Sequence, residues 1–379
     1  MEIYLDNAAT SHPKPECTLE AVRDAMTRLN ANPGRAGHAR SLAAGRLVLE
    51  ARETLALVLG AADPFGIVHA FNCTDALNLA IKGGLKAGSH VVSTMLEHNS
   101  VLRVLMEKKR RGEIEVTLVR PRGYFVDARD VQNAIRPNTR LIVVTHASNV
   151  TGAVQPVEEI CQLARRKGIL SLVDGAQRLG GAPVDVRAMG CSLYAFPGHK
   201  SLLGPTGTGG LYIEPGLVLD TVREGGTGSS SDSMLQPDDP PERYEAGTVN
   251  LAGIAGLKAG AQYVQTRLLE IHARERELTD QLYRGIRSLP GAVVYAPEEP
   301  STRAGIVSLN LGGLSSSELA DALDRAGICA RGGLHCAPGA HEMLGTLRRG
   351  AVRLSVGYAT TPGEIEQTLR VLREIAGGT

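Results

Sequence analysis

The chain has 379 residues, with 41 basic and 40 acidic side chains and no tryptophan. Its length suggests two or three domains, and balanced charge without long single-sign runs gives no indication of a nucleic-acid or membrane partner. The start of the chain lacks a signal-peptide pattern, and no apolar run approaches the roughly 20 residues of a membrane span. Six cysteines are spread out without a C-x-x-C pair. This spacing argues against a zinc or other metal site and against a disulfide framework, and it favours a cytoplasmic protein.

Short apolar runs alternate with longer helical patterns in the first part of the chain. Strands are predicted at 67–71, 91–94, 141–145, 170–173 and 210–213, and helices at 75–82, 100–110, 127–134 and 157–167. This alternation predicts an α/β domain with a mostly parallel sheet. In such sheets, ligands bind outside the carboxyl ends of the strands.

The last third of the chain has a different pattern. A long helical stretch covers 251–289, shorter α and β units follow, and an amphipathic run covers 362–375. The segment 225–241, rich in Gly, Ser, Asp and Pro, is predicted to be a long loop, and loops of this length are usually functional or disordered. We therefore expect a large α/β domain over 16–264 and a smaller α+β domain over 265–379, with the N-terminal segment 1–15 packed on the smaller one.

Lys200 is one of only eight lysines in the chain, and it lies in the small-residue turn Phe-Pro-Gly-His-Lys. Glycines permit close approach of a ligand to the main chain. A lysine that forms a Schiff base must be partly desolvated, so that its amine can lose a proton. Taken alone, this position favours the alternative of a solvated surface lysine in a loop.

Asp174 directly follows a predicted buried strand. A carboxylate at that point is costly unless a cation pairs with it. The pyridinium nitrogen of pyridoxal 5′-phosphate is a suitable partner, because a carboxylate there keeps the ring protonated and electron-withdrawing. Gln177, three residues further on, is then placed to bond the ring oxygen. The alternative is that Asp174 caps a following helix.

Three other predicted strands are also followed by informative polar residues. Thr74 can N-cap the helix after the first strand, and the free N–H groups of a helix N-terminus bind phosphate. His98 follows the second strand, where it can stack on a cofactor ring and relay protons. Asn149 follows the third strand and can reach a ring oxygen or a substrate carboxylate.

Two residues of the expected smaller domain carry further chemistry. Cys336 lies in a glycine-containing loop beside Arg331 and His335, a setting that favours a nucleophilic thiol. Arg353 lies on a predicted apolar strand, where a guanidinium suggests a bidentate carboxylate partner. The alternatives are an inert buried cysteine and an edge-strand salt bridge.

Together these residues resemble the class V, fold-type I enzymes that use pyridoxal phosphate, and within them the cysteine desulfurase and selenocysteine lyase family. The resemblance runs nearly end to end. Its motifs are Tyr4-Leu-Asp-Asn-Ala-Ala-Thr10, Cys73-Thr-Asp-Ala-Leu-Asn78, Glu97-His98, Ser148-Asn-Val-Thr-Gly152, Asp174-Gly-Ala-Gln177, Gly198-His-Lys200, Gly204-Pro-Thr-Gly207, Glu245-Ala-Gly-Thr248, Arg331-x-Gly-x-His-Cys336-Ala and Val352-Arg-Leu-Ser355.

The resemblance implies a role for each matching residue. It implies that Lys200 is the Schiff-base residue and proton shuttle, and that Cys336 takes sulfur from L-cysteine as a persulfide and leaves L-alanine. It also implies a homodimer, in which Thr248 reaches the phosphate bound by the other subunit, and a sulfur-acceptor protein or thiol. The remaining implied roles are ring contacts by Asp174, Gln177, Asn149 and His98, a phosphate cradle of Cys73, Thr74 and His199, and a substrate carboxylate clamp of Arg353 with Asn149 and Asn7.

The sequence departs from the family pattern at Pro197, where the family usually has Ser or Thr, and at Gly332 and Leu334, where it usually has polar residues. Three alternatives therefore stay open at this point. They are a lyase acting on selenocysteine or another β-substituted amino acid, a class V aminotransferase, and a protein that binds pyridoxal phosphate without turnover.

Overall fold

The computed structural model describes residues 2–34, 37–229 and 231–377 and contains a larger and a smaller β-sheet. The larger sheet has the strand order β2 (Ile67–Ala70), β8 (Gly209–Ile213), β7 (Leu193–Pro197), β6 (Leu170–Asp174), β5 (Thr139–Thr145), β3 (Ser89–Thr94) and β4 (Ile114–Val119). Only β8 runs against its neighbours. The mostly parallel α/β sheet expected from the sequence is thus confirmed.

Helices cover both faces of the larger sheet, because successive strand residues point to opposite sides. In β6, Leu172 packs in the core beneath one set of helices and Val173 in the core beneath the other. One face carries α3 (Cys73–Gly84) and α4 (Asn99–Arg110). The other face carries α2 (Ala39–Leu59), α5 (Ala128–Asn133), α6 (Val157–Arg166), α7 (Val186–Met189) and part of α8 (Leu251–Arg287).

The smaller sheet is antiparallel, with the order β12 (Arg331–Gly333), β13 (Ala351–Ser355), β10 (Ile306–Leu311) and β9 (Ala292–Tyr295). The other helices of this part are α9 (Ser316–Arg325), α10 (Pro338–Met343) and α11 (Pro362–Gly377). The short strand β1 (Ile3–Tyr4) pairs in parallel with β11 (Ile328–Cys329), and Ile3 and Leu5 join the core of the smaller sheet.

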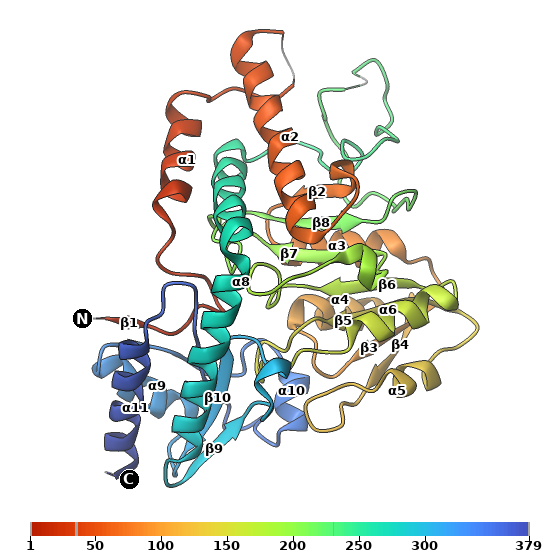
Figure 1. Cartoon of the computed structure of the whole chain (residues 1–379). Helices are drawn as coiled ribbons and strands as arrows, with labels where there is room; N and C mark the ends of the chain where they lie inside the picture. Colours follow the sequence, from red (N-terminus) through yellow and green to blue (C-terminus); the bar gives the residue numbers. More distant parts are fainter. Residues whose placement is uncertain (1, 35–36, 230, 378–379) are drawn as a thin grey trace.

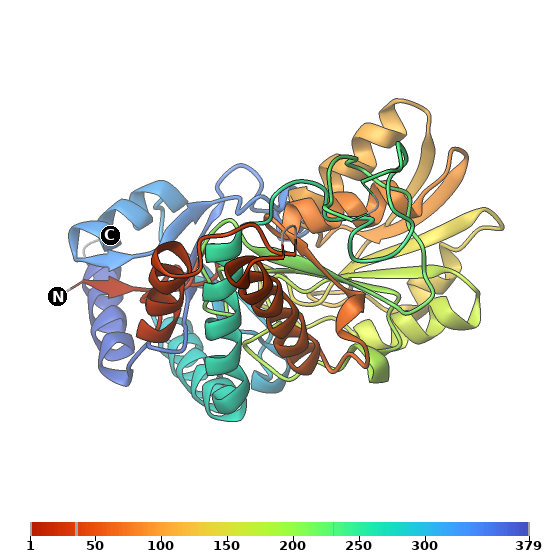
Figure 2. The ribbon, with the colours of Figure 1, turned by 90° about the horizontal axis from the view of Figure 1, so that it is seen from above.

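One helix connects the two sheets. Figure 1 shows α8 running from the larger sheet to the smaller one, and Figure 2 shows α1 (Glu16–Thr27) and α2 beside it. Leu257 and Ala261 of α8 belong to the core of the larger sheet, whereas Leu278 and Leu282 belong to the core of the smaller one. We propose that the domain division falls between 264 and 265, inside this unbroken helix.

The segment between β8 and α8 contains the expected long loop. Within the described part of 225–241 there is neither helix nor strand. No helix in the described ranges is both long enough and apolar enough to cross a membrane.

Candidate active site

Five parallel strands of the larger sheet direct their carboxyl ends toward one cavity of about 600 Å³. The loops and helix starts that follow β2, β3, β5, β6 and β7 supply its walls. This placement agrees with the general rule for open α/β sheets. The cavity brings together eight residues predicted from the sequence, which are Cys73, Thr74, His98, Asn149, Asp174, Gln177, His199 and Lys200.

Asp174 is the last residue of β6, and only 3% of it is exposed. Its Oδ1 accepts hydrogen bonds from Ala176 N at 3.0 Å and from the Cys73 thiol at 3.6 Å. Burial, followed by the Asp174 charge, raises the pKa of Cys73 well above its usual value. No described donor bonds Oδ2 of Asp174, so this oxygen is available to a cation. The helix-capping alternative is wrong, because residues 175–178 form a turn and not a helix.

Lys200 lies in the turn after β7 and is partly buried. Burial, with the nearby charge of Arg353, lowers the pKa of its amine, which favours the neutral form that a nucleophile or base requires. In the described part of the chain, no hydrogen bond engages Lys200 Nζ. A second amine lies close by, since Lys14 Nζ donates to His199 O at 2.7 Å, and burial lowers the pKa of Lys14 to about 8.

His199 combines a main-chain and a side-chain role. Its carbonyl accepts hydrogen bonds from Ser11 N at 3.1 Å and from Thr10 Oγ1 at 3.1 Å. Its Nδ1 is buried without a hydrogen-bond partner among the described residues. Burial, followed by the charge of Lys200, lowers the pKa of His199 to about 4. The ring is therefore a neutral group whose buried Nδ1 is bonded by no described residue.

The first turn of α3 differs from its prediction. Asn72, not Thr74, is the N-cap, because the Asn72 side chain accepts a hydrogen bond from Asp75 N. Thr74 is the second residue of the helix, and its Oγ1 is 2.7 Å from Ser100 Oγ. The hydroxyl of Thr74 and the first N–H groups of α3 therefore share one end of the cavity.

His98 is the N-cap of α4, since its Nδ1 accepts from Ser100 N at 3.1 Å. The same Nδ1 lies 2.8 Å from Ser100 Oγ, so Ser100 links His98 to Thr74. Burial is the main cause that lowers the pKa of His98. Because Nδ1 acts as an acceptor, the neutral ring carries its proton on Nε2.

Arg353 lies on β13, a central strand of the smaller sheet, and not on an edge strand. Its Nη1 donates to Asn149 O at 3.1 Å, and its Nη2 pairs with Asp6 Oδ1 at 2.8 Å. The Nε is buried without a partner among the described residues. Asn7 does not line the cavity. Its Nδ2 donates to the carbonyls of Tyr4 and Ser355, so the Asn7 amide ties the N-terminal segment to the smaller sheet.

Gln177 forms a wall of the cavity beside the N-terminal segment. Its Nε2 donates to Ala8 O at 3.1 Å. The amide oxygen has no described hydrogen-bond donor. Gln177 thus has one amide atom fixed by the protein and one atom open to a ligand.

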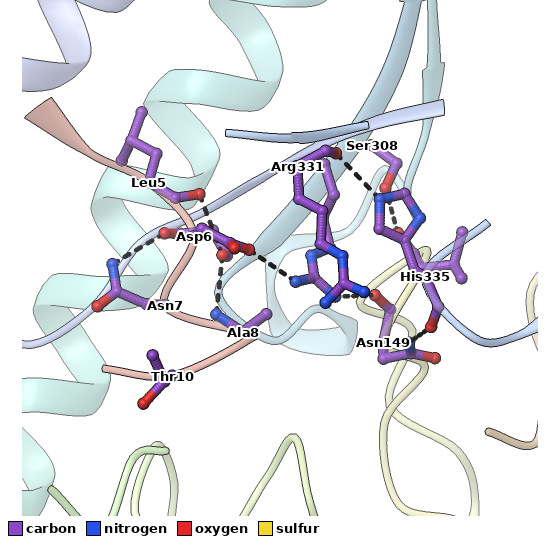
Figure 3. A network of polar contacts seen from close by, with 12 residues as sticks. Leu5, Asp6, Asn7, Ala8, Thr10, Asn149, Ser308, Arg331 and His335 are labelled. Carbon is purple, nitrogen blue, oxygen red and sulfur yellow. Dashed lines mark hydrogen bonds and ion pairs between the residues drawn. The ribbon is translucent and has the colours of Figure 1, made fainter. Parts of the chain in front are cut away.

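Cys336 is exposed in the turn between β12 and α10. Two hydrogen bonds fix this turn to the cavity wall: Asn99 N donates to Cys336 O at 2.7 Å, and Asn149 Nδ2 donates to His335 O at 2.6 Å. Figure 3 shows the Asn149 amide beside the His335 carbonyl. The expectation that His335 activates the thiol from a neighbouring position is wrong. The His335 ring is buried, bonds Arg331 O at 3.0 Å, and has a pKa lowered to about 3, chiefly by burial.

Thr248 is exposed and lies outside this cavity. It lines a separate pocket of about 450 Å³ with His69, Gly207 and Arg223. Within one chain, Thr248 is therefore not brought together with the other predicted phosphate residues.

Several residues of the site have no prediction from the sequence. They are Asp6, Lys14 and Ser100. Asp6 is adjacent to the predicted residue Asn7, in the motif Tyr-Leu-Asp-Asn. Ser100 lies two residues after the predicted residue His98, in the motif His-Asn-Ser. Their polar side chains beside predicted site residues were the available signal. Lys14 had no such signal, because its contact with His199 depends on the fold.

Comparison with known proteins extends the resemblance over the whole chain. The model of the family "Aminotransferase class-V" matches residues 3–368. A protein named "Probable cysteine desulfurase" from Methanothermobacter thermautotrophicus is 37% identical over 394 residues, which cover 99% of this chain and 95% of that protein. Another protein of that name, from Aeropyrum pernix, is 35% identical, covering 98% of this chain and 94% of its own length.

Solved structures show the same relationship. The apo structure of a cysteine desulfurase from Thermococcus onnurineus has a TM-score of 0.90 and 32% identity, covering 100% of this chain and 95% of that one. The Escherichia coli cysteine desulfurase CsdA has a TM-score of 0.87 and 26% identity, with coverages of 100% and 95%. These neighbours confirm the fold-type I architecture. The chain belongs to the aminotransferase class-V family and, within it, to the group of the cysteine desulfurases.

Proposed function

We propose that this protein is a pyridoxal-phosphate-dependent cysteine desulfurase, which converts L-cysteine to L-alanine and leaves the sulfur as a persulfide on Cys336. The observation that carries the proposal is the tether between the exposed Cys336 turn and the cavity that holds Lys200 and Asp174. A non-catalytic binding protein, an aminotransferase or a simple lyase requires no exposed thiol held at that place.

The described residues fit pyridoxal phosphate. Asp174 Oδ2 offers a buried carboxylate oxygen to the ring nitrogen, and Lys200 offers an amine without a hydrogen-bond partner among the described residues. His199 Nδ1 is an orphaned buried polar atom next to the helix start at Cys73 and Thr74, where free N–H groups favour a phosphate. His98, Gln177 and Asn149 line the remaining wall. When bound, the cofactor supplies an electron sink for charge that develops at the substrate Cα.

The protein's own residues then perform the proton and sulfur transfers. Arg353 and Asn149 orient the substrate carboxylate, because a guanidinium suits bidentate contact with a carboxylate. Lys200 removes the Cα proton as a neutral amine and returns a proton to the alanine product. The Cys336 thiolate attacks the substrate Sγ, so that the S–S bond forms while the Cβ–S bond breaks. Cysteine and the enzyme thiol thus become alanine and an enzyme persulfide, with no external oxidant or reductant.

The proposal includes a homodimer, in which Thr248 completes the phosphate site of the other subunit, and an acceptor thiol or protein that removes sulfur from Cys336. Its support is the exposed position of Thr248 away from its own chain's cavity. A reducing location such as the cytoplasm is also part of the proposal, because the persulfide requires a free thiol. All six cysteines are free in this structure.

The deciding experiment compares the wild-type protein with Cys336→Ser. After treatment with L-cysteine, we expect alanine and one added sulfur on Cys336 by peptide mass spectrometry. Cys336→Ser should bind the cofactor and cysteine but release little sulfide. Cys17 is the other exposed cysteine, and Cys17→Ser is therefore the matched control with wild-type behaviour. Pyruvate and ammonia as products, or full activity of Cys336→Ser on cysteine, would instead establish a lyase.

A further inference from the structure

The turn that carries Cys336 has an unfavourable main-chain conformation. His335 and Cys336 have φ angles of +51° and +56°, a left-handed region that residues other than glycine rarely occupy. Such a conformation persists only where surrounding contacts impose it. The two hydrogen bonds to the carbonyls of His335 and Cys336 hold the turn from the cavity side. Other contacts must hold it from the side of the smaller sheet.

A chain of buried polar side chains lies on that side. The His335 ring bonds Arg331 O through Nε2 at 3.0 Å, and its Nδ1 is 3.3 Å from His341 Nε2. His341 Nδ1 is in turn 2.8 Å from Thr346 Oγ1. The planes of the two imidazole rings are inclined by 24°, and their centroids are 5.5 Å apart. His335, His341 and Thr346 are at most 4% exposed. Figure 3 shows the His335 ring directed at the Arg331 carbonyl.

The donor and acceptor chemistry of these groups fixes the position of each proton in this series of hydrogen bonds. Arg331 O can only accept, so His335 carries its proton on Nε2 and its Nδ1 accepts. His341 must therefore donate from Nε2, and its Nδ1 accepts the hydroxyl proton of Thr346. Both rings are neutral in this arrangement. Burial, the main cause in each case, lowers the pKa of His335 to about 3 and that of His341 to about 4, in agreement with neutral rings.

We propose that His335, His341 and Thr346 form a positioning chain that holds the strained Cys336 turn in place for sulfur transfer. This inference rests on the proposed role of Cys336 as sulfur acceptor. None of the three side chains touches the cavity that holds Lys200, so they act through the main chain of the turn. Loss of the Thr346 hydroxyl leaves His341 free to change its tautomer, and His335 then loses a donor at Nδ1.

The test uses two variants of the holoenzyme that differ by one hydroxyl. Thr346→Val keeps the shape and removes the donor, whereas Thr346→Ser keeps the donor. Two steps are measured: exchange of the Cα hydrogen of L-cysteine for deuterium, which requires Lys200, and formation of the Cys336 persulfide in a single turnover. We expect Thr346→Val to keep the exchange rate and the visible cofactor absorbance, while persulfide formation slows at least tenfold. Thr346→Ser should behave like the wild type.

A second pair keeps the test decisive if the valine variant folds poorly. In His341→Gln the amide can still donate to His335 Nδ1, whereas in His341→Leu it cannot. Persulfide formation should be retained in the first and lost in the second.

Equal persulfide rates in the wild type and Thr346→Val, or equal losses of exchange and persulfide formation, would overturn the positioning chain. Failure of the proposed function has a different signature. In that case Cys336→Ser processes L-cysteine at the wild-type rate, whatever the Thr346 variants do.

Discussion

Arg353 Nη2 and Asp6 Oδ1 form an ion pair at 2.8 Å that joins the smaller sheet to the N-terminal segment. The Arg353 side chain is 2% exposed and that of Asp6 is 22% exposed, so the guanidinium is desolvated and its direction is fixed. The pair leaves Nε of Arg353 without a partner among the described residues. The N-terminal segment therefore helps to orient the group proposed to receive the substrate carboxylate.

We predict that Asp6→Asn raises the KM for L-cysteine about tenfold with a smaller change in kcat. The Asn oxygen can still accept a hydrogen bond, but the charge that orients Arg353 is lost, and breaking a charge-assisted bond costs about 1.5–3 kcal/mol. Steady-state kinetics measure the effect. Asp238→Asn removes an exposed pair with Arg243 and is the control without effect. An unchanged KM in Asp6→Asn would show that Asp6 does not orient the guanidinium.

The lysine that binds the cofactor can be identified by reduction. Borohydride should trap pyridoxal phosphate covalently on the wild-type protein and on Lys14→Ala, but not on Lys200→Ala. The reason is that Lys14 Nζ already donates to His199 O, whereas no described residue bonds Lys200 Nζ. Peptide mass spectrometry locates the modified lysine. Covalent trapping in Lys200→Ala would assign the bond to another amine.

Asp174→Asn separates the charge of this residue from its local hydrogen bonds. The Asn oxygen can still accept from Ala176 N, but it cannot pair as a carboxylate with a ring cation. We expect weaker cofactor binding and a fall in kcat of about 100-fold or more, in line with the loss of one preorganised electrostatic contact. Asp174→Ala should be at least as impaired. Near-normal turnover in both variants would mean that Asp174 only fixes the turn after β6.

The neutral histidine pair predicts a pH dependence of stability. The folded-state pKa values of His335 and His341 lie below the unfolded value, because the rings are buried and Arg353 and Arg331 add positive charge near His335. As the pH falls below about 6.5, the unfolded chain therefore binds more protons than the folded protein. The contribution of the two neutral rings to the free energy of unfolding is complete above that pH and is lost below it.

Between pH 6.5 and pH 5, the loss should be about 1.6 kcal/mol for each ring. Chemical denaturation at both pH values should show a smaller loss in His341→Gln than in the wild type. Identical losses in the two proteins would exclude His341 as a titrating contributor.

The proposed trans role of Thr248 can be tested by mixing subunits. We expect a dimer by light scattering, and Thr248→Val should weaken cofactor binding about tenfold. A heterodimer of Thr248→Val with Lys200→Ala should regain one high-affinity active site, because intact Lys200 and intact Thr248 then meet across the interface. If Thr248 acts within its own chain, no such recovery occurs. An active monomer would contradict the dimer itself.

The sequence predicted the cavity well for a physical reason. Thr74, His98, Asn149, Asp174 and Lys200 each follow a strand, and parallel strands direct their carboxyl ends to one edge. Recognition of four short strands, at 67–71, 91–94, 141–145 and 170–173, therefore places four of these distant residues together. The strand preceding Lys200, β7, is not among the predicted strands, and Lys200 is indicated instead by its small-residue turn and by the resemblance.

The contacts around Cys336 could not be predicted in the same way. His335 is adjacent to Cys336 in the sequence, but its ring is directed away by His341 and the Arg331 carbonyl. A left-handed main-chain conformation at two successive side-chain-bearing residues contradicts local preference. It depends on Asn99 and Asn149, more than 180 residues away, and such tertiary contacts leave no periodic pattern.

The unbroken helix α8 couples the larger sheet mechanically to the smaller one. Its 37 residues extend about 55 Å at 1.5 Å per residue, and its two ends are embedded in different cores. Because α8 is continuous, it passes a rotation of one sheet on to the other sheet. A change in the angle between the two sheets must therefore bend α8 or carry it along. Because Cys336 lies beside β12 of the smaller sheet and Lys200 follows β7 of the larger sheet, the distance between them depends on the angle that α8 maintains between the two sheets.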